Sequence, residues 1–392
     1  MTPNPYVKQY LMTAGPTPVP PAVSQAMAAP MLYHRAPAFD ALYERVLARL
    51  PHVFRTENPV LAFAASGTGA LESAVANLVR PGTKALAAAA GKFGERWIQL
   101  CEAYGADLVR HEPGWGVRLD PADFDRLLTE HPDVEVVFTT LSETSTGIVH
   151  DIQAIAEVVR RHGALLVVDA VSGLGATRLE QDAWGVDVVV AGSQKALMTP
   201  PGLAFASVSQ RALDAANASA EGGGRYYFDW GRTAKSQAGG ASPFTPAVSL
   251  FLGLDVALEM IEAEGLEDVW ARHDVLARAT RAGALALGLD LYGDPDDRAT
   301  VVTAIELPGD VDGGKVPGAL RKLGITANGG QDHLKGKILR IAHCGYFGAF
   351  DILTSLSGLE MALQQLGHEV EQGTGVGAAQ RVFLEAGVLA AA

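Results

Sequence analysis

Lys195 is the residue from which the chemistry of this sequence can be read. It follows a β-branched run at Val188–Val190 and the small, polar turn Gly192-Ser193-Gln194. Such a run predicts a buried parallel strand, so Lys195 is expected just beyond the carboxyl end of a sheet strand. Open α/β sheets bind their ligands at this edge. A lone lysine on a turn is more often an ordinary surface residue, so the interpretation depends on its neighbours.

Two further strand ends carry groups that complement an amine. The stretch 163–173 contains a second apolar run, which ends at the carboxylate of Asp169 and is followed by small residues. A buried carboxylate needs a cation or several donors, and a helix cap is the alternative role. At Ser66-Gly67-Thr68-Gly69 a strand meets a glycine turn and an amphipathic helix, a layout that offers N–H groups and a helix dipole to an anion. A phosphate cradle, a carboxylate and a lysine are the three partners that pyridoxal phosphate needs.

Length and composition bound the class of protein. The chain has 392 residues, of which 48% are hydrophobic and 19% charged, so we expect a globular protein of two domains. A net charge of −13 argues against nucleic acid or an anionic membrane as a partner and favours small-molecule chemistry. Cys101 and Cys344 show no disulfide framework or metal-ligand spacing, so we expect buried thiols and no metal. Without a signal-peptide pattern or a membrane-spanning run, the protein is expected in the cytoplasm.

Regular alternation predicts the elements that position these strand ends. Amphipathic helices are expected over Phe39–Val53 and over 151–162, where Asp151 is the N-cap and Gly163 the stop. The pattern predicts an α/β fold with a mostly parallel sheet covered on both faces. The expected strands lie near 60–64, 84–90, 106–110, 134–140, 164–169, 186–191 and 203–208.

The pattern changes after residue 210. Residues 211–245, which include Glu221–Gly224, are the least regular and are interpreted as a long functional loop. A strongly helical connector over 248–287 leads into the second domain. That domain is expected to contain strands at 301–307 and 336–343, a helix near 313–322, and helices at 350–366 and 377–388 split by the glycines of 373–377. The predicted organisation is an N-terminal arm over 1–20, a large domain over 21–255 and a small domain over 256–392.

Three loops add candidate groups, each with an ordinary alternative. Phe93 can stack on a flat ring or belong to the core. The hydroxyls of Ser142–Gly147 can face a ligand or cap their own loop. The loop Tyr33-His34-Arg35 can line a site for an anionic substrate or make solvated polar contacts.

Taken together, these stretches resemble fold-type I pyridoxal-phosphate enzymes, specifically the class V aminotransferases of the alanine–glyoxylate and serine–pyruvate kind. The resemblance runs from Thr13–Pro18 through the motifs above to Arg340-Ile-Ala-His343 and covers nearly the whole chain. It implies a large domain with a seven-stranded sheet, a smaller C-terminal α+β domain, and pyridoxal 5'-phosphate as the cofactor. It also implies a homodimer with shared active sites.

The resemblance implies a role for each matching residue. Lys195 resembles the lysine that binds the cofactor covalently, Asp169 the partner of the pyridine nitrogen, and Arg340 the grip on the substrate carboxylate. The other candidates lie around cofactor and substrate: Gly67, Thr68 and Gln194 at the phosphate, Phe93 and Val171 on the two ring faces, Ser145 near the phenolic oxygen, and Gly15 and Tyr33 at the substrate.

The chain departs from the family at one loop. In the family this loop crosses from the partner subunit to the phosphate and often has Asn or Thr before a proline, whereas residues 241–245 here read Ala-Ser-Pro-Phe-Thr. Ser242 or Thr245 is expected to supply the hydroxyl, and the sequence does not distinguish between them.

The resemblance predicts a transaminase that moves an amino group from alanine or serine to glyoxylate or pyruvate by a ping-pong mechanism. Aspartate is an alternative donor if His34, Arg35 or Gln331 offers a second carboxylate site. A cysteine desulfurase shares the fold but usually stacks a histidine on the ring and needs a cysteine on a mobile loop, whereas Cys344 follows Arg340 in a strand-like segment. Similar chains described as the small subunit of a soluble hydrogenase suggest a non-catalytic partner, although the intact candidate set argues for catalysis.

Overall fold

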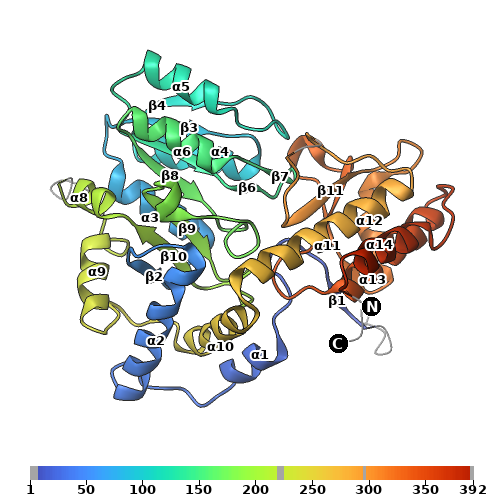
Figure 1. Ribbon diagram of the computed structural model, residues 1–392, viewed down its shortest axis with the longest axis horizontal. Helices are drawn as coiled ribbons and strands as arrows, with labels where there is room; N and C mark the ends of the chain where they lie inside the picture. Colours follow the sequence, from blue (N-terminus) through green and yellow to red (C-terminus); the bar gives the residue numbers. More distant parts are fainter. Residues whose placement is uncertain (1–7, 219–224, 295–296, 389–392) are drawn as a thin grey trace.

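The computed structural model describes residues 8–218, 225–294 and 297–388, and its larger part is built on a seven-stranded sheet (Figure 1). The strand order is β2-β10-β9-β8-β5-β3-β4. Within this sheet β10 runs antiparallel to both neighbours and the other pairings are parallel, as predicted. All seven expected strands are present: β2 (Val60–Phe63), β3 (Lys84–Ala88), β4 (Asp107–His111), β5 (Val136–Thr140), β8 (Leu165–Asp169), β9 (Val188–Gly192) and β10 (Ala204–Val208).

Side chains alternate along each strand and build one core on each face of the sheet. On β9, Val188 and Val190 belong to one core, while Val189 and Ala191 belong to the other. Both sets are apolar because helices cover both faces. One face packs against α3 (Gly67–Leu78), α4 (Lys92–Ala103), α8 (Gln210–Ala218) and α9 (Trp230–Ala238). The opposite face packs against α2 (Pro37–Phe54), α5 (Pro121–Glu130), α6 (Ile152–Arg161) and α10 (Val248–Glu264).

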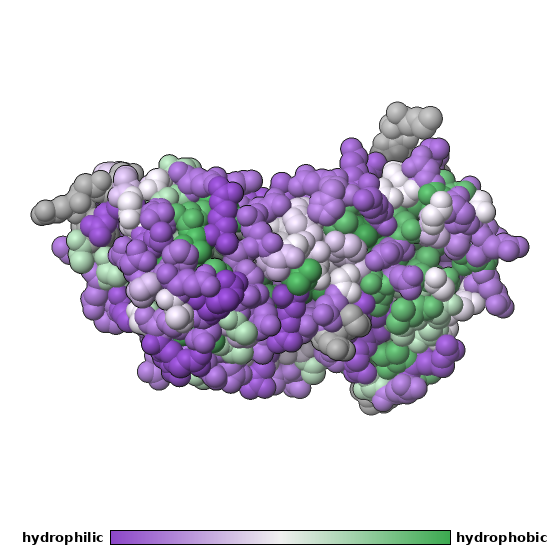
Figure 2. All heavy atoms as spheres, turned by 90° about the horizontal axis from the view of Figure 1, so that it is seen from above, coloured by the Kyte–Doolittle hydropathy of each residue, from purple (hydrophilic) through white to green (hydrophobic). Residues whose placement is uncertain are grey.

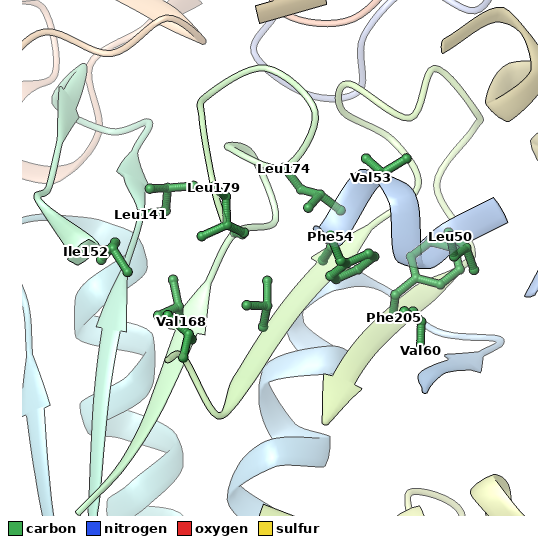
Figure 3. Packing of buried hydrophobic residues seen from close by; sticks show 14 of the residues in the cluster. Leu50, Val53, Phe54, Val60, Leu141, Ile152, Val168, Leu174, Leu179 and Phe205 are labelled. Atoms are coloured by element: carbon green, nitrogen blue, oxygen red, sulfur yellow. The ribbon is translucent and has the colours of Figure 1, made fainter. Parts of the chain in front are cut away.

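Helix α2 closes the second of these cores (Figure 3). Its residues Leu50 and Phe54 are fully buried and lie near Val60 and Phe205 of the adjacent strands. Burying each such side chain contributes about 1.5 to 3 kcal/mol. The helix ends at Phe54 because Arg55 adopts a left-handed conformation with φ 55°.

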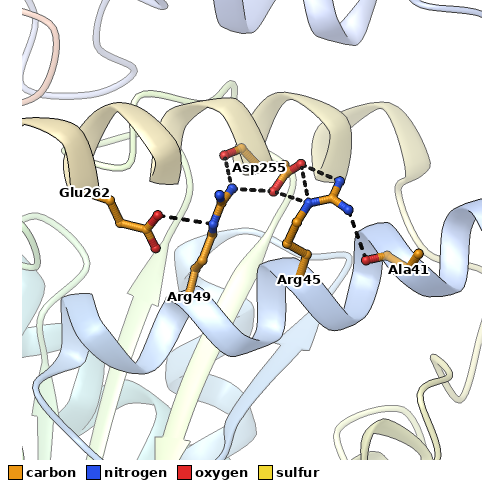
Figure 4. Close-up of polar contacts among 5 residues, drawn as sticks. All are labelled: Ala41, Arg45, Arg49, Asp255 and Glu262. Carbon is orange, nitrogen blue, oxygen red and sulfur yellow. Dashed lines mark hydrogen bonds and ion pairs between the residues drawn. The ribbon is translucent and has the colours of Figure 1, made fainter.

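Ion pairs hold α2 to α10 (Figure 4). The Asp255 carboxylate of α10 lies 2.7 Å from Arg45 and 2.7 Å from Arg49 of α2, and Glu262 lies 3.2 Å from Arg49. The side chain of Asp255 is only 15% exposed, so solvent screens this network less than an isolated surface pair. Helix α10 leads directly into α11 (Leu266–Ala286), so the connector is fixed to the large sheet.

The C-terminal part has its own antiparallel sheet, with the strand order β11-β14-β13, and a separate core. The packing of α11 changes along its length, because Val269 belongs to the core of the large sheet and Leu276 to the smaller core. We therefore propose that the two domains divide within α11, later than residue 255. The elements of this part are β11 (Val302–Glu306), η1 (Gly313–Lys315), α12 (Val316–Lys322), β13 (Asn328–Gly329), η2 (Asp332–Leu334), β14 (Ile338–Ala342), α13 (Ala349–Gln365) and α14 (Thr374–Glu385).

Two expectations for irregular segments are wrong. The two expected C-terminal helices are present, but the break between them lies at 366–373 and not over the glycines of 373–377, because α14 begins at Thr374 and Glu360 caps it by accepting the N–H groups of Gly373 and Gly375. Residues 211–245 are not one long loop, because α8 and α9 lie within them. Helix α9 is anchored by Trp230, which is fully buried, and capped by Asp229. The expected feature Glu221–Gly224 lies outside the described residues.

The N-terminal arm connects the two parts. Its first seven residues lie outside the described chain, and β1 (Tyr10–Leu11) then pairs with β12 (Ile325–Thr326) of the C-terminal part. The arm continues in extended form across the edge of the large sheet to α1 (Pro21–Met27). It therefore passes the expected position of the site.

The surface is largely hydrophilic in the view of Figure 2, with hydrophobic residues gathered mainly on the right, where Figure 1 places the C-terminal helices. Among the described residues, none of the helices combines the length and the apolar character that crossing a membrane requires.

Candidate active site

A pocket of about 280 Å³ opens at the carboxyl ends of β8 and β9. The structure brings most of the expected groups together around it, including the lysine, the carboxylate and the glycine turn. The expected residues in its lining are Gly15, Gly67, Thr68, Phe93, Asp169, Val171, Gln194 and Lys195.

The N-terminal arm holds Lys195 in place. The Lys195 amine donates to the carbonyl of Ala14 at 2.5 Å, and the Thr17 hydroxyl donates to the Lys195 carbonyl at 2.9 Å. At Gly15, φ is 154° and an added Cβ would lie 2.5 Å from Lys195 Cε, so the arm needs glycine here. Burial lowers the pKa of Lys195, and Arg340 and Arg96 act in the same direction, which favours the neutral amine needed for a nucleophile or base.

Asp169 is the last residue of β8 and is 5% exposed. Its carboxylate accepts the N–H of Val171 at 2.7 Å, in a turn that does not begin a helix, so the helix-cap alternative does not apply. Burial raises the pKa of Asp169 from 3.8 to about 7, the charge of Glu143 adds to this rise, and Arg96 and Lys195 oppose it. A cation placed against this carboxylate would restore its ionised form.

The glycine turn forms the start of α3. Ser66 caps the helix by accepting the N–H of Gly69 at 3.4 Å, and the first N–H groups of any helix have no internal partner. A Cβ at Gly67 would lie 2.9 Å from Val171, so glycine lets the turn approach the opposite wall. The amide oxygen of Gln194 is buried, with no hydrogen-bond partner in the described part of the chain. Rotating the amide group by about 180° would place its NH2 group where the oxygen lies, so this side chain can donate a hydrogen bond to an anion.

Phe93 and Val171 both line the pocket, from the first turn of α4 and the turn after β8. Phe93 is partly buried, so its assignment to the pocket replaces the alternative of a core phenylalanine. A flat ring bound between these two side chains would contact an aromatic face on one side and an aliphatic group on the other.

Glu143 is a buried carboxylate that the sequence analysis did not single out. It is 1% exposed, and its two oxygens accept the N–H groups of Phe93 and Gly94 at 3.0 Å and that of Ser145 at 3.1 Å. Because Gly91 at the N-cap has no side chain, Glu143 caps α4 from outside and thereby fixes Phe93. Burial raises the pKa of Glu143, while these donors act against the rise. A glutamate among hydroxyl residues directly after a strand was the available signal.

Ser145 does not line the pocket, contrary to its expected position. Its hydroxyl donates to Glu143 at 2.5 Å and accepts the N–H of Lys92 at 3.0 Å. The hydroxyl proton is therefore already used and is not free for a phenolic oxygen. Thr144 lies in the pocket lining instead.

Arg340 lies on β14 and is 6% exposed. Its guanidinium donates to the carbonyls of Gly329 at 3.0 Å and Thr144 at 2.8 Å, and within the described chain it forms no ion pair. Removing an unpaired guanidinium from water is costly, so this arrangement is suited to a carboxylate ligand. Arg340 does not itself line the Lys195 pocket, but its charge lowers the pKa of the Lys195 amine.

Several expected residues lie outside this pocket of their own chain. Tyr33, His34 and Thr245 line a larger, mainly apolar hollow of about 630 Å³, which lacks both the lysine and the carboxylate. Ser242 lies with Thr245 around a small gap beside Phe251. Arg35 is exposed, and Gln331 precedes η2 with its amide oxygen buried.

Residues 9–342 match the class-V aminotransferase family, so the chain belongs to this family. It is 42% identical over 381 residues to the small subunit of a soluble hydrogenase from Synechococcus sp., with 96% of this chain and 98% of that protein covered. It is 36% identical to the serine–glyoxylate aminotransferase of Methylorubrum extorquens, with 96% of each covered. The crystal structure of ureidoglycine–glyoxylate aminotransferase from Bacillus subtilis has a TM-score of 0.91 and 30% identity, covering 98% of this chain and 99% of that chain.

The protein is therefore an aminotransferase with the fold-type I architecture, and enzymes of this family and fold use pyridoxal phosphate. The pocket fits that cofactor on three independent observations. Among the described residues, the Asp169 carboxylate is buried without an ion pair and the Gln194 amide oxygen is buried without a hydrogen-bond partner, and a side chain would not fit at the glycine turn of Gly67.

Proposed function

We propose that this protein transfers an amino group from a small L-amino acid, alanine or serine, to a small 2-oxo acid, glyoxylate or pyruvate, by a ping-pong mechanism. The observation that carries the proposal is the buried guanidinium of Arg340, which forms no ion pair within the described chain, donates to the carbonyl of the pocket residue Thr144, and has a charge that lowers the pKa of Lys195. It suits the α-carboxylate that amino acids and 2-oxo acids share. Two of the similar proteins described above are named for glyoxylate as a substrate, which supports a small acceptor.

The residues of the pocket divide the work. When bound, pyridoxal phosphate supplies an aldehyde that condenses with amines and a ring that accepts electrons. Lys195 is placed to hold and return the substrate α-proton, because burial lowers the pKa of its amine. Asp169 is placed to pair with the protonated ring nitrogen. Phe93 and Val171 would hold the ring, and Thr144, which lines the pocket, would take the role expected of Ser145.

Small acceptors in the names of similar proteins support a small donor as well. A dicarboxylate such as aspartate needs a second group near Arg340; His34, Arg35 and Gln331 do not line the Lys195 pocket of their own chain, so the aspartate alternative requires the partner's loop that also carries Tyr33. The similarity to a hydrogenase subunit raises a second candidate, a non-catalytic partner of redox proteins. Lys195 and Asp169 line one pocket, and the buried Arg340 donates to the pocket residue Thr144, which supports catalysis over that role.

A transamination screen of the purified protein tests the proposal. Alanine, serine, aspartate and glutamate would be crossed as donors with glyoxylate, pyruvate, oxaloacetate and 2-oxoglutarate as acceptors. We expect turnover for the small donors and acceptors, and parallel lines in double-reciprocal plots. Arg340→Lys should raise KM for both substrates, because lysine cannot form a bidentate pair. Turnover restricted to dicarboxylates would favour the aspartate alternative. A holoprotein inactive with every pair, which co-purifies with redox subunits, would overturn the assignment.

We further propose a cytoplasmic homodimer in which each chain contributes to its partner's site. Ser242, Thr245 and Tyr33 do not line the Lys195 pocket of their own chain, which agrees with a role in the partner's site. A Lys195→Ala chain mixed with a Ser242→Ala, Thr245→Ala chain should regain partial activity, because one site of the mixed dimer has both the lysine and the donated hydroxyls. A fully active monomer, or no regain after verified subunit exchange, would contradict this arrangement.

A further inference from the structure

Arg96 lies in the wall of the pocket and is not neutralised by a carboxylate. Its guanidinium donates to the Thr68 hydroxyl at 3.2 Å and lies 5.2 Å from the centre of the Phe93 ring. Across the part of the chain that the structure describes, no carboxylate lies within ion-pair distance of it. Lys92, one turn earlier on α4, differs in this respect, because it pairs with Asp332 at 2.7 Å and with Glu95 at 3.4 Å.

The other groups at this end of the pocket carry no full positive charge. The turn at Gly67 and Thr68 offers backbone N–H groups and a hydroxyl, and Gln194 offers an amide. A phosphate dianion is held more strongly where an arginine adds charge-assisted hydrogen bonds to such donors. Arg96 is the cation that the described structure places beside this turn, whereas Arg340 is held separately by Thr144 and Gly329.

We propose that Arg96 is a phosphate-binding residue that pairs with the cofactor phosphate at Thr68. This inference rests on the proposed placement of pyridoxal phosphate between Lys195 and the glycine turn. The Phe93 ring beneath the guanidinium restricts its motion, so less conformational freedom is lost on binding. The two arginines of the site then divide the anions, with Arg340 for the substrate carboxylate and Arg96 for the phosphate.

The charge of Arg96 also extends into the pocket. It lowers the pKa of Asp169, in the direction that keeps this carboxylate ionised, and it lowers the pKa of Lys195. Pairing with a phosphate would offset both effects, so the pKa values of Asp169 and Lys195 would rise when the phosphate binds.

Equilibrium binding to the cofactor-free protein tests the role, with pyridoxal phosphate and unphosphorylated pyridoxal as the two probes. Arg96→Gln should weaken the binding of pyridoxal phosphate by about 10- to 100-fold, or about 1.4 to 2.8 kcal/mol, and weaken pyridoxal binding much less. Arg96→Lys should recover part of the loss, because it keeps the charge and loses the planar fork. The phosphorus resonance of the bound cofactor should shift in both variants.

Arg110→Gln is the matched control, because it removes the same charge from an exposed arginine paired with Glu102 on the protein surface. It should leave the affinity for both probes unchanged. Equal weakening of both probes by Arg96→Gln, equal affinity in wild type and variant, or the same loss in the Arg110→Gln control would each overturn the role of Arg96. Borohydride reduction separates the two proposals: if pyridoxal phosphate binds wild type but is not fixed at Lys195, the proposed function fails as well.

Discussion

Replacing Asp169 by Asn should make the cofactor-free protein more stable at neutral and alkaline pH. The side chain is 5% exposed, and burial raises its pKa from 3.8 to about 7. In the unfolded chain the same carboxyl group is solvated and ionises near its ordinary pKa. Folding therefore opposes ionisation at this position.

The sign follows from proton binding in the two states. As the pH rises from about 4 to about 7, the unfolded state loses a proton that the folded state keeps, so Asp169 lowers the unfolding free energy of wild type over this interval. A pKa difference of about three corresponds to at most about 4 kcal/mol. Asn has no proton to lose and can still accept the N–H of Val171. The unfolding free energy of the variant should therefore increase relative to that of wild type as the pH rises. The difference should reach about 4 kcal/mol above pH 7.

Urea unfolding of both cofactor-free proteins between about pH 5 and about pH 8 measures this difference, and comparing the two proteins cancels the titration of groups that do not interact with Asp169. Adding pyridoxal phosphate should reverse the order, because a protonated ring nitrogen pairs with an ionised Asp169 and not with Asn. A stability difference that stays constant or shrinks as the pH rises would refute the reasoning. So would a variant that the cofactor stabilises as much as wild type.

Three further substitutions probe the walls of the site. Lys195→Ala should abolish turnover and prevent borohydride from fixing the cofactor to the peptide containing residue 195; a labelled Lys92 in wild type would contradict this. Gly15→Ala should displace the Lys195 side chain and lower kcat at least about tenfold, which corresponds to about 1.4 kcal/mol. Gly82→Ala is the control, because φ there is 89° and no atom lies within 4 Å of the added Cβ; it should change stability and leave kcat unchanged. Glu143→Gln should lower the unfolding free energy by about 1 to 3 kcal/mol, because an amide nitrogen must face N–H donors; an unchanged melting temperature would show that the cap is dispensable.

Much of the fold could be predicted because its strands are buried on both faces. A run such as Val188–Val190 is apolar throughout, and each run marked a strand to within a few residues. The ends of these strands then located Asp169 and Lys195, since parallel strands place their carboxyl ends at one edge. The expected fold class and the aminotransferase family were confirmed.

Features that depend on side-chain direction and distant packing could not be predicted in this way. Thr144 and Ser145 have equivalent hydroxyls in the turn between β6 (Ser142–Glu143) and β7 (Ile148–Val149), and the sequence does not show that Ser145 bonds to Glu143 whereas Thr144 lines the pocket. Glu143 gains its importance from N–H groups about fifty positions away, at Phe93 and Gly94. Helix α9 was not predicted because of its small residues, and its position depends on the burial of Trp230.

The path of the N-terminal arm has a consequence for how the protein is made. The carbonyl of Ala14 contacts Lys195, but β1, just before it, pairs with Ile325 and Thr326. A ribosome releases the arm first and its pairing partner more than three hundred residues later. Through much of translation, the arm that contacts Lys195 therefore lacks the strand with which it pairs. The active site is completed only late in biosynthesis.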